Sequence, residues 1–327
     1  MTAAGAVKTA KAAKGRVQAA GYAFIATLAT TVPEALLRPL FRLGADIAWR
    51  RRGRGVRQLE RNLRRVVGSE LPDAEFAALS RAAMRSYARY WLEFFRLPVL
   101  RRERIVGRMN VEGKDRLDAV MAAGRGAILA LPHMGNWDHA GAWVALQGYP
   151  FATVAERLQP ESLFDRFVAV RERLGMEVIA LTGGRNAFAV LLERLRAGKL
   201  VCLVTERDLA SSGVDVAFFG EQTTMPPGPA ALAVATGAAL FPVGIWFTDE
   251  GGPGGGWAAT IHPEITPPAG LDRRTQIARM TQAMADTFAA DIAAHPQDWH
   301  MLQRIWPADR QAVPAAEPVV VEARRAP

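Results

Sequence analysis

Apolar residues recur at helical spacing in the first hundred residues of this chain. Three segments carry the pattern, at residues 33–49, 54–66 and 72–95. The last of these has a wide stripe of aromatic and aliphatic side chains, and Pro98 lies just beyond its end. We therefore predict that the N-terminal part of the chain is helical.

From about residue 108, short apolar runs alternate with helical segments. The runs predict strands at residues 126–131, 151–155, 177–180, 200–205, 214–219, 240–247 and 258–261. The helical segments cover residues 114–123, 137–146, 162–174, 186–197, 229–236 and 273–294. This alternation is typical of α/β proteins. We expect a central mixed, largely parallel sheet flanked by helices, with a helical N-terminal region.

These changes of pattern divide the chain into three parts. Residues 1–107 are predicted to form a helical region that packs on the core, and residues 108–307 form the α/β core. Residues 308–327 are rich in alanine, proline and charge, and we expect them to be disordered. The glycine-rich run at 251–256 is predicted to be a loop between two strands.

The net charge of +9 is concentrated at the N-terminus. Residues 1–65 hold fourteen Lys or Arg and only three acidic residues, so the rest of the chain is nearly neutral. The uncharged stretch from Val17 to Pro33 is short and polar for a transmembrane helix, and it lacks the features of a signal peptide. We expect a basic helix on an anionic membrane surface. The alternative is a buried helix with a solvated basic flank.

Cysteine and histidine are too sparse to suggest a metal site or a disulfide framework. Cys202 is the only cysteine, and it lies in the apolar run Leu200–Val204, so we expect a buried thiol. His262, His295 and His300 do not have the spacing of metal ligands. No metal is therefore expected.

One segment, His133-Met-Gly-Asn-Trp-Asp138, follows a predicted buried strand and carries candidate catalytic residues. Asn136 is suited to cap the helix that begins there, and Gly135 permits a tight turn. Asp138 can then face back to His133 and fix its tautomer, which leaves the second imidazole nitrogen to take a proton from an alcohol. From these residues alone, a catalytic pair and a merely hydrogen-bonded turn histidine are equally open. The neighbouring His139 is interpreted as structural.

This segment resembles the His-x4-Asp/Glu motif of the lipid A late-acyltransferase superfamily. Other landmarks match in order over nearly the whole chain to about residue 307: the segment Arg157–Arg171, the run Thr205-Glu-Arg-Asp208, and the blocks Phe218–Gly220 and Gly228–Ala233. The Trp after Asn136, the Glu-Arg-Asp triplet and residues 157–176 are most similar to actinobacterial phosphatidylinositol mannoside acyltransferases.

The resemblance implies an O-acyltransferase that moves a long-chain acyl group onto a mannose hydroxyl of a phosphatidylinositol mannoside. Acyl-CoA such as palmitoyl-CoA would be a co-substrate, and no cofactor is implied. The protein would act peripherally at the cytoplasmic face of the plasma membrane. An acyl carrier protein is the alternative donor.

Site roles follow from the resemblance and from side-chain chemistry. His133 is the predicted general base, with Asp138 as its orienting partner. Glu206 is predicted to bind acceptor hydroxyls or to tune the His133 pair, and the alternative is a salt bridge with an arginine. Arg157 and Arg171 suit phosphate groups of the substrates. Asp208 is a weaker substrate-binding candidate.

Two other functions compete with this interpretation. Lipid A precursor acyltransferases share the motif, but they usually carry Asp-Gln where this chain has Glu206-Arg207-Asp208. A non-enzymatic protein that binds a membrane or nucleic acid would explain the basic N-terminus. Few aromatic residues lie among the basic ones and no nucleic-acid motif is present, so a nucleic-acid partner is not expected.

Overall fold

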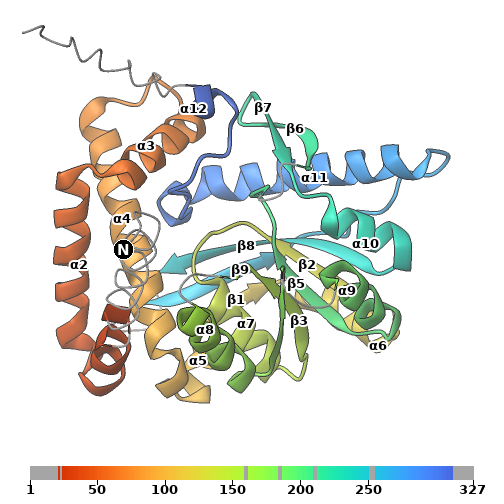
Figure 1. Ribbon diagram of the computed structural model, residues 1–327, viewed down its shortest axis with the longest axis horizontal. Coiled ribbons are helices and arrows are strands. Elements are labelled where there is room, and N and C mark those ends of the chain that lie inside the picture. The colour runs from red at the N-terminus through yellow and green to blue at the C-terminus, as the bar shows by residue number, and fades with distance from the viewer. Residues whose placement is uncertain are drawn as a thin grey trace, which may run out of the picture.

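The computed structural model describes residues 21–22, 24–157, 161–182, 186–208, 212–249 and 255–311. At its centre lies a seven-stranded sheet with the strand order β1-β9-β8-β2-β5-β3-β4 (Figure 1). Strands β8 and β9 pair antiparallel, and the other neighbours in this sheet pair in parallel. The predicted mixed, largely parallel sheet flanked by helices is confirmed.

The elements follow one another in the alternation that the sequence predicts. The strands of the central sheet are β1 (Met109–Glu112), β2 (Ala127–Leu131), β3 (Phe151–Ala155), β4 (Met176–Ala180), β5 (Leu200–Val204), β8 (Ala239–Thr248) and β9 (Gly256–Ile261). The helices among them are α5 (Arg102–Gly107), α6 (Lys114–Ala122), α7 (Trp137–Leu146), α8 (Glu161–Arg173), α9 (Ala187–Arg196), α10 (Gly228–Thr236) and α11 (Arg273–Ala294).

Helices cover both faces of the sheet because its strands are apolar on both sides. Along β2, Ile128 and Ala130 pack in the core that contains α9, α10 and α11, whereas Leu129 and Leu131 pack in the core that contains α5, α6 and α7. Successive side chains of a strand point to opposite faces, so one five-residue strand contributes to both cores. This two-sided burial is typical of parallel sheets.

The N-terminal region is helical, as predicted. It comprises α2 (Glu34–Arg51), α3 (Arg54–Val67) and α4 (Asp73–Arg96), which lie together along one side of the sheet in Figure 1. Of the expected surface helix at residues 17–33, the part from 24 to 31 is helical and residues 17–20 and 23 lie outside the described residues. No helix in the described part of the chain is long and apolar enough to span a membrane.

Some short elements differ from the prediction. Strands β6 (Val214–Phe218) and β7 (Glu221–Met225) form a hairpin. The turn that joins them consists of Phe219 and Gly220, both with positive φ. The sequence predicts only the first of these strands, because β7 is mostly polar. Strand β1 and helix α5 were not predicted either, because each is too short to show a period.

The first residues of the expected disordered tail are ordered. Residues Ala308–Gln311 form the short helix α12, and Asp309 is buried. Its carboxylate accepts hydrogen bonds from Gln58 and Arg65 of α3. These contacts explain why a charged residue is buried in this short helix. Residues 312–327 lie outside the described residues, as does most of the glycine-rich run at 251–256.

Candidate active site

The histidine motif forms the connection between the buried strand β2 and helix α7. Gly135 adopts a positive φ of 58° there, and a β-carbon at this position would lie 2.6 Å from the carbonyl oxygen of Ile245. Only glycine fits this close approach. Asn136 is the N-cap of α7, because its side-chain oxygen accepts the backbone N–H of His139 at 2.9 Å.

Glu206 holds the imidazole of His133. Its carboxylate lies 2.8 Å and 3.0 Å from His133 Nδ1 through its two oxygens, and it also accepts the backbone N–H of His133 at 2.7 Å. The Glu206 side chain is fully buried, whereas that of His133 remains 28% exposed. Burial alone would raise the pKa of Glu206, but the charge and hydrogen bonds of His133 outweigh burial and hold this pKa below its ordinary value.

The register of the sheet explains this pairing. Leu131 of β2 lies opposite Val204 of β5 in a parallel pair. Two residues further along each chain come His133 and Glu206, at the carboxyl ends of neighbouring strands. In α/β sheets, functional side chains commonly lie at this edge.

The predicted hydrogen bond between His133 and Asp138 is wrong. Asp138 lies in the first turn of α7, and its carboxylate accepts hydrogen bonds from Arg171 Nε at 2.7 Å, from Arg171 Nη2 at 3.1 Å and from the Tyr90 hydroxyl at 2.9 Å. The helical turn therefore directs Asp138 to α8 and α4 rather than back to the loop. The orienting carboxylate of His133 is Glu206, which was predicted to tune this pair.

Arg171, predicted as a phosphate ligand, is thus paired with the carboxylate of Asp138, a contact that the sequence did not predict. Burial alone would lower the pKa of Arg171, but the charge and hydrogen bonds of Asp138 outweigh burial and raise it above its ordinary value. Burial also raises the pKa of Tyr90 well above its ordinary value. Asp138, Arg171 and Tyr90 thus form a buried polar cluster beside His133.

The remaining predicted substrate ligands lie apart from this cluster. Arg157 forms an ion pair with Glu161, four residues further along the chain, and both side chains are partly exposed. Asp208 accepts hydrogen bonds from the backbone N–H of Gly213 at 2.8 Å and from the Thr224 hydroxyl at 3.0 Å. These contacts tie the segment after β5 to the β6–β7 hairpin, so the structure gives Asp208 a structural role instead.

A cavity of about 500 Å³ begins at His133 and runs between the sheet and α7. Its polar lining residues are His133, Asp138, Glu156, Arg171, Arg207, His300 and Gln303, together with Tyr87, Tyr90 and Thr153. Most of the other lining side chains are aliphatic or aromatic and come from β1, β2, β3, β5, β8, β9 and α7. The arrangement is a deep apolar pocket with the histidine and charged groups at one end.

Cys202 lines this apolar part of the cavity. Burial alone raises the pKa of its thiol far above the ordinary value. The thiol is therefore not a nucleophile at neutral pH, in agreement with its interpretation as an inert apolar side chain.

The segment from Pro296 to Trp306 holds the other side of the histidine loop. The backbone N–H of His300 donates to the carbonyl oxygen of His133 at 2.8 Å, and that of Gly135 donates to the carbonyl oxygen of Asp298 at 2.8 Å. His300 is itself buried, which lowers its pKa to about 3. His139 is likewise buried and stacks on Trp257, as expected for a structural residue.

Sequence reasoning missed Tyr90 and the pair formed by Glu156 and Arg207. Arg207 Nη2 donates to a carboxylate oxygen of Glu156 at 3.0 Å, and both residues line the cavity. Glu156 directly follows β3, which pairs in parallel with β5. Its position at the carboxyl end of a predicted strand could therefore have identified it as a site residue. Tyr90 had no comparable signal, because it belongs to a long aromatic stripe on α4.

The arrangement can perform general-base chemistry on an alcohol. Because Glu206 accepts from His133 Nδ1, the Nε2 atom is the one left to accept a proton. Among the residues that the structure describes, no three or more His, Cys, Asp or Glu side chains are grouped so that they could hold a metal ion.

Comparisons with known proteins agree in pointing to acyl transfer. Residues 11–307 match the family described as bacterial lipid A biosynthesis acyltransferase. A phosphatidylinositol mannoside acyltransferase of Mycolicibacterium smegmatis is 50% identical over 299 residues, which are 90% of this chain and 93% of that protein. A protein of the same name from Mycobacterium tuberculosis is 50% identical over 281 residues, or 85% of each chain.

The buried ion pair between Asp138 and Arg171 predicts a large stability effect. In Asp138→Ala the Arg171 guanidinium stays buried without its carboxylate, and removal of one partner from a buried pair costs about 3–5 kcal/mol. We expect the free energy of unfolding, measured by urea denaturation, to fall by about 3 kcal/mol. Glu161→Ala breaks the exposed pair with Arg157 and should cost less than about 1 kcal/mol. Equal losses in the two variants would contradict this account of Asp138.

Proposed function

Because this chain belongs to the bacterial lipid A biosynthesis acyltransferase family and is an O-acyltransferase, we propose that it acylates a phosphatidylinositol mannoside. The donor is a long-chain acyl-CoA such as palmitoyl-CoA, and the acceptor is a mannose hydroxyl. His133 is the general base. The observation that carries this proposal is that the His133–Glu206 pair stands at one end of a deep apolar cavity.

The chemistry of the step follows from the atoms of His133. A sugar hydroxyl has a pKa far above neutrality, so its proton must leave as the oxygen attacks the thioester carbonyl carbon. Nε2 takes this proton while Glu206 stabilises the resulting imidazolium through Nδ1. The new C–O bond forms, the C–S bond breaks, and the thiolate of coenzyme A leaves and recovers a proton from the imidazolium. No covalent enzyme intermediate is needed.

The apolar part of the cavity suits the acyl chain of the donor. Leu129, Val243 and Ile261 from the sheet and Trp143 from α7 are among its walls. A chain that enters from the His133 end places its thioester beside the imidazole and its methyl end among these side chains. Burial of each methylene group contributes about 0.8 kcal/mol, so the cavity favours long chains.

The charged rim offers groups for a sugar acceptor. Glu156, Arg207 and Gln303 line the cavity beside His133, and the Glu156 side chain is about half exposed. Carboxylate and amide oxygens accept hydrogen bonds from sugar hydroxyls, and a site built to bond hydroxyls discriminates against substrates that lack them. We assign the mannose to this rim. Arg157 stays a candidate for the acceptor phosphate.

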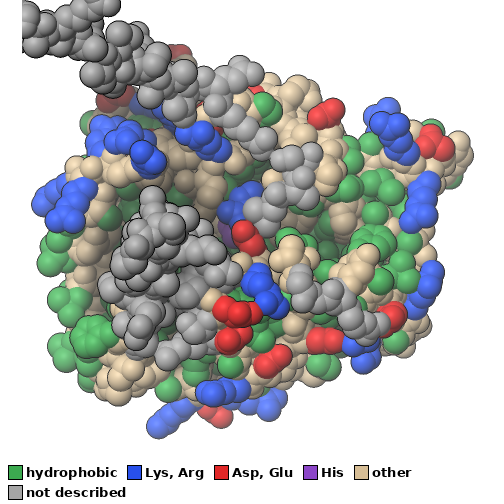
Figure 2. All heavy atoms as spheres, viewed as in Figure 1, with side chains coloured by type: hydrophobic (Ala, Val, Ile, Leu, Met, Phe, Trp, Pro, Cys, Tyr) green, Lys and Arg blue, Asp and Glu red, His purple; other side chains and the backbone are tan. Residues whose placement is uncertain are grey.

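An exposed apolar stripe on α2 supports a peripheral position at the cytoplasmic face of the plasma membrane. Its members are spaced at helical intervals. They are Leu36 (61% exposed), Leu40 (59%), Leu43 (54%) and Ile47 (39%). Arg50 and Arg51 follow in the last turn. Figure 2 shows the hydrophobic side chains along the outer edge of α2, with Lys and Arg gathered beyond them toward α3. Such a face suits a bilayer that contains anionic lipids.

The acceptor is tested by direct competition. We expect purified protein with palmitoyl-CoA to acylate phosphatidylinositol mannoside in preference to a lipid A precursor or lysophosphatidate, measured by mass spectrometry. His133→Ala should lower turnover by about 10²–10⁴-fold, the usual contribution of a general base. Preference for either of the other acceptors would reject the mannoside assignment but leave acyl transfer in place.

The acyl position is tested at Cys202, two residues deeper along β5 than Val204. Cys202→Phe adds a ring inside the cavity that would displace several methylene groups of a palmitoyl chain. We therefore expect the ratio of palmitoyl to octanoyl transfer to fall by about tenfold or more. Cys202→Val changes the volume little and should keep the wild-type ratio. An unchanged ratio in a folded Cys202→Phe protein would exclude this cavity as the acyl site.

The membrane face is tested on α2. Leu43→Asp should weaken binding to phosphatidylinositol-containing vesicles by at least about tenfold, because burial of one leucine contributes about 1.5–3 kcal/mol. Leu271→Asp is the matched control, since Leu271 is a similarly exposed leucine outside α2. Binding measured by co-sedimentation should also weaken as salt is raised. Equal affinities of the two variants would remove α2 from the membrane contact.

A further inference from the structure

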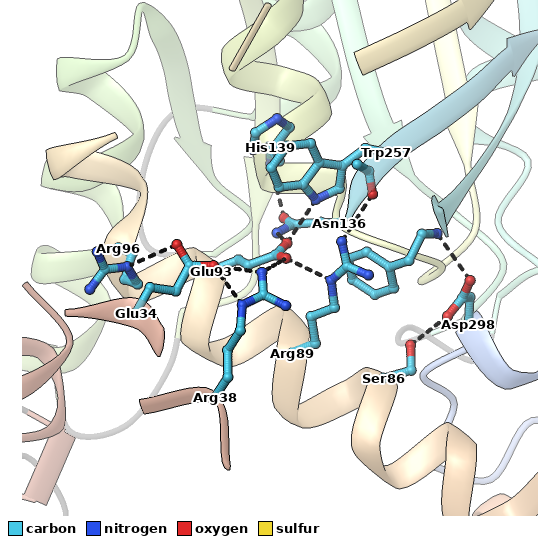
Figure 3. Close-up of polar contacts among 12 residues, drawn as sticks. Glu34, Arg38, Ser86, Arg89, Glu93, Arg96, Asn136, His139, Trp257 and Asp298 are labelled. Atoms are coloured by element: carbon cyan, nitrogen blue, oxygen red, sulfur yellow. Dashed lines mark hydrogen bonds and ion pairs between the residues drawn. The ribbon is translucent and has the colours of Figure 1, made fainter. Parts of the chain in front are cut away.

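Glu93 of α4 is a buried carboxylate on which donors from three parts of the chain converge. Its Oε1 atom accepts from Arg89 Nε at 2.7 Å, and its Oε2 atom accepts from Asn136 Nδ2 and from Trp257 Nε1, both at 2.8 Å (Figure 3). Only 4% of the Glu93 side chain is exposed. A buried carboxylate is tolerated only when donors surround it, so these contacts fix the positions of all four residues.

Asn136 joins Glu93 to the histidine loop. A carboxylate can only accept hydrogen bonds, so the Asn136 side chain must direct its amide N–H₂ group to Glu93. Its oxygen then faces the backbone N–H of His139 and caps α7. Both ends of this buried amide are therefore used, one for the helix and one for Glu93.

The position of Asn136 in the chain gives the contact its significance. It lies three residues after His133 and two before Asp138, so the same short segment carries both. Neither Glu93 nor Asn136 lines the cavity. They therefore do not touch a substrate held there, and any effect on the reaction must pass through the loop.

We propose that Glu93 is a positioning residue for acyl transfer, which through Asn136 holds the His133 loop at its working distance from the substrates. The inference rests on the proposed general-base role of His133. Backbone hydrogen bonds to the segment 298–300 hold the loop at His133 and Gly135. The hydrogen bond from Asn136 to Glu93 holds the loop where it joins α7. A displacement of about 1 Å of a reacting group can cost about 100-fold in rate.

Asn136→Ser separates the two tasks of the asparagine. Serine is a good N-cap, so α7 keeps its first hydrogen bond, but the shorter side chain cannot reach Glu93. We expect kcat for acyl transfer to fall by at least about tenfold. The KM values for acyl-CoA and for the acceptor should stay within about twofold of wild type, because the cavity lining is unchanged.

Trp257→Phe is the matched control. It removes the other hydrogen bond to the same Oε2 atom and keeps an aromatic ring against His139. We expect a fall in melting temperature comparable with that of Asn136→Ser, but a kcat within about twofold of wild type. Equal losses of kcat in the two variants would show a general loosening and overturn the proposal, as would a wild-type kcat in Asn136→Ser.

Glu93→Gln supplies the conservative variant. Its amide oxygen still accepts from Asn136 and Trp257, while its nitrogen faces Arg89. The melting temperature should therefore fall, whereas kcat should exceed that of Asn136→Ser several-fold. A kcat below that of Asn136→Ser would show that the charge of Glu93, not the position of the loop, matters, and would overturn the proposal.

Each variant is compared with wild-type protein and His133→Ala on the same substrates. If wild-type protein transfers no acyl group to the mannoside, the proposed acceptor fails and the variants are compared on the acceptor that the wild type uses. On an acceptor that the wild type uses, the positioning role fails if Asn136→Ser has the kcat of the wild type or of Trp257→Phe, or if Glu93→Gln has a lower kcat than Asn136→Ser.

Discussion

The register in which β2 pairs with β5 determines the catalytic geometry. Leu131 lies opposite Val204, and the next two residues of each chain bring His133 and Glu206 together. A slip of one residue would turn the side chains of β5 to the other face, and the buried carboxylate would lose the imidazole. The apolar side chains that fill both faces of the sheet resist such a slip. The hydrophobic core is therefore what keeps the imidazole of His133, the proposed general base, in contact with the carboxylate of Glu206.

Buried carboxylates lie around the histidine loop, and each has its own donors. Glu206 is paired with His133, Asp138 with Arg171 and Tyr90, and Glu93 with Arg89 and Asn136. Each carboxylate is thus compensated where it lies, since an unpaired buried charge would cost several kcal/mol. What looks like one His–Asp pair in the sequence is a loop that links three separate polar clusters.

The sequence predicts the elements well because the strands and helices have clear periods. It places the histidine after a buried strand and Asn136 as a helix cap, and both are confirmed. It fails on the partner of His133 because Asp138 is near in the chain, whereas Glu206 becomes a neighbour only through the strand order. The ion pair between Arg171 and Asp138 was missed for the same reason, since it depends on how α8 packs against α7. Contacts between distant segments leave no periodic signal.

The helical N-terminal region contributes side chains directly to the candidate active site. Helix α4 supplies Tyr90 to the Asp138 cluster and lines the cavity with Tyr87, Trp91 and Phe94. The same helix is tied to α2, because Arg81 and Arg85 donate to Asp46 and hold its pKa well below the ordinary value.

The helix proposed to lie on the bilayer is thus joined by a charged cluster to the helix that frames the cavity. In the proposed membrane-bound arrangement, a rigid connection of this kind would set the height of His133 above the bilayer. The proposed lipid acceptor, whose sugar would project a fixed distance from the bilayer, would then reach the imidazole without leaving the surface.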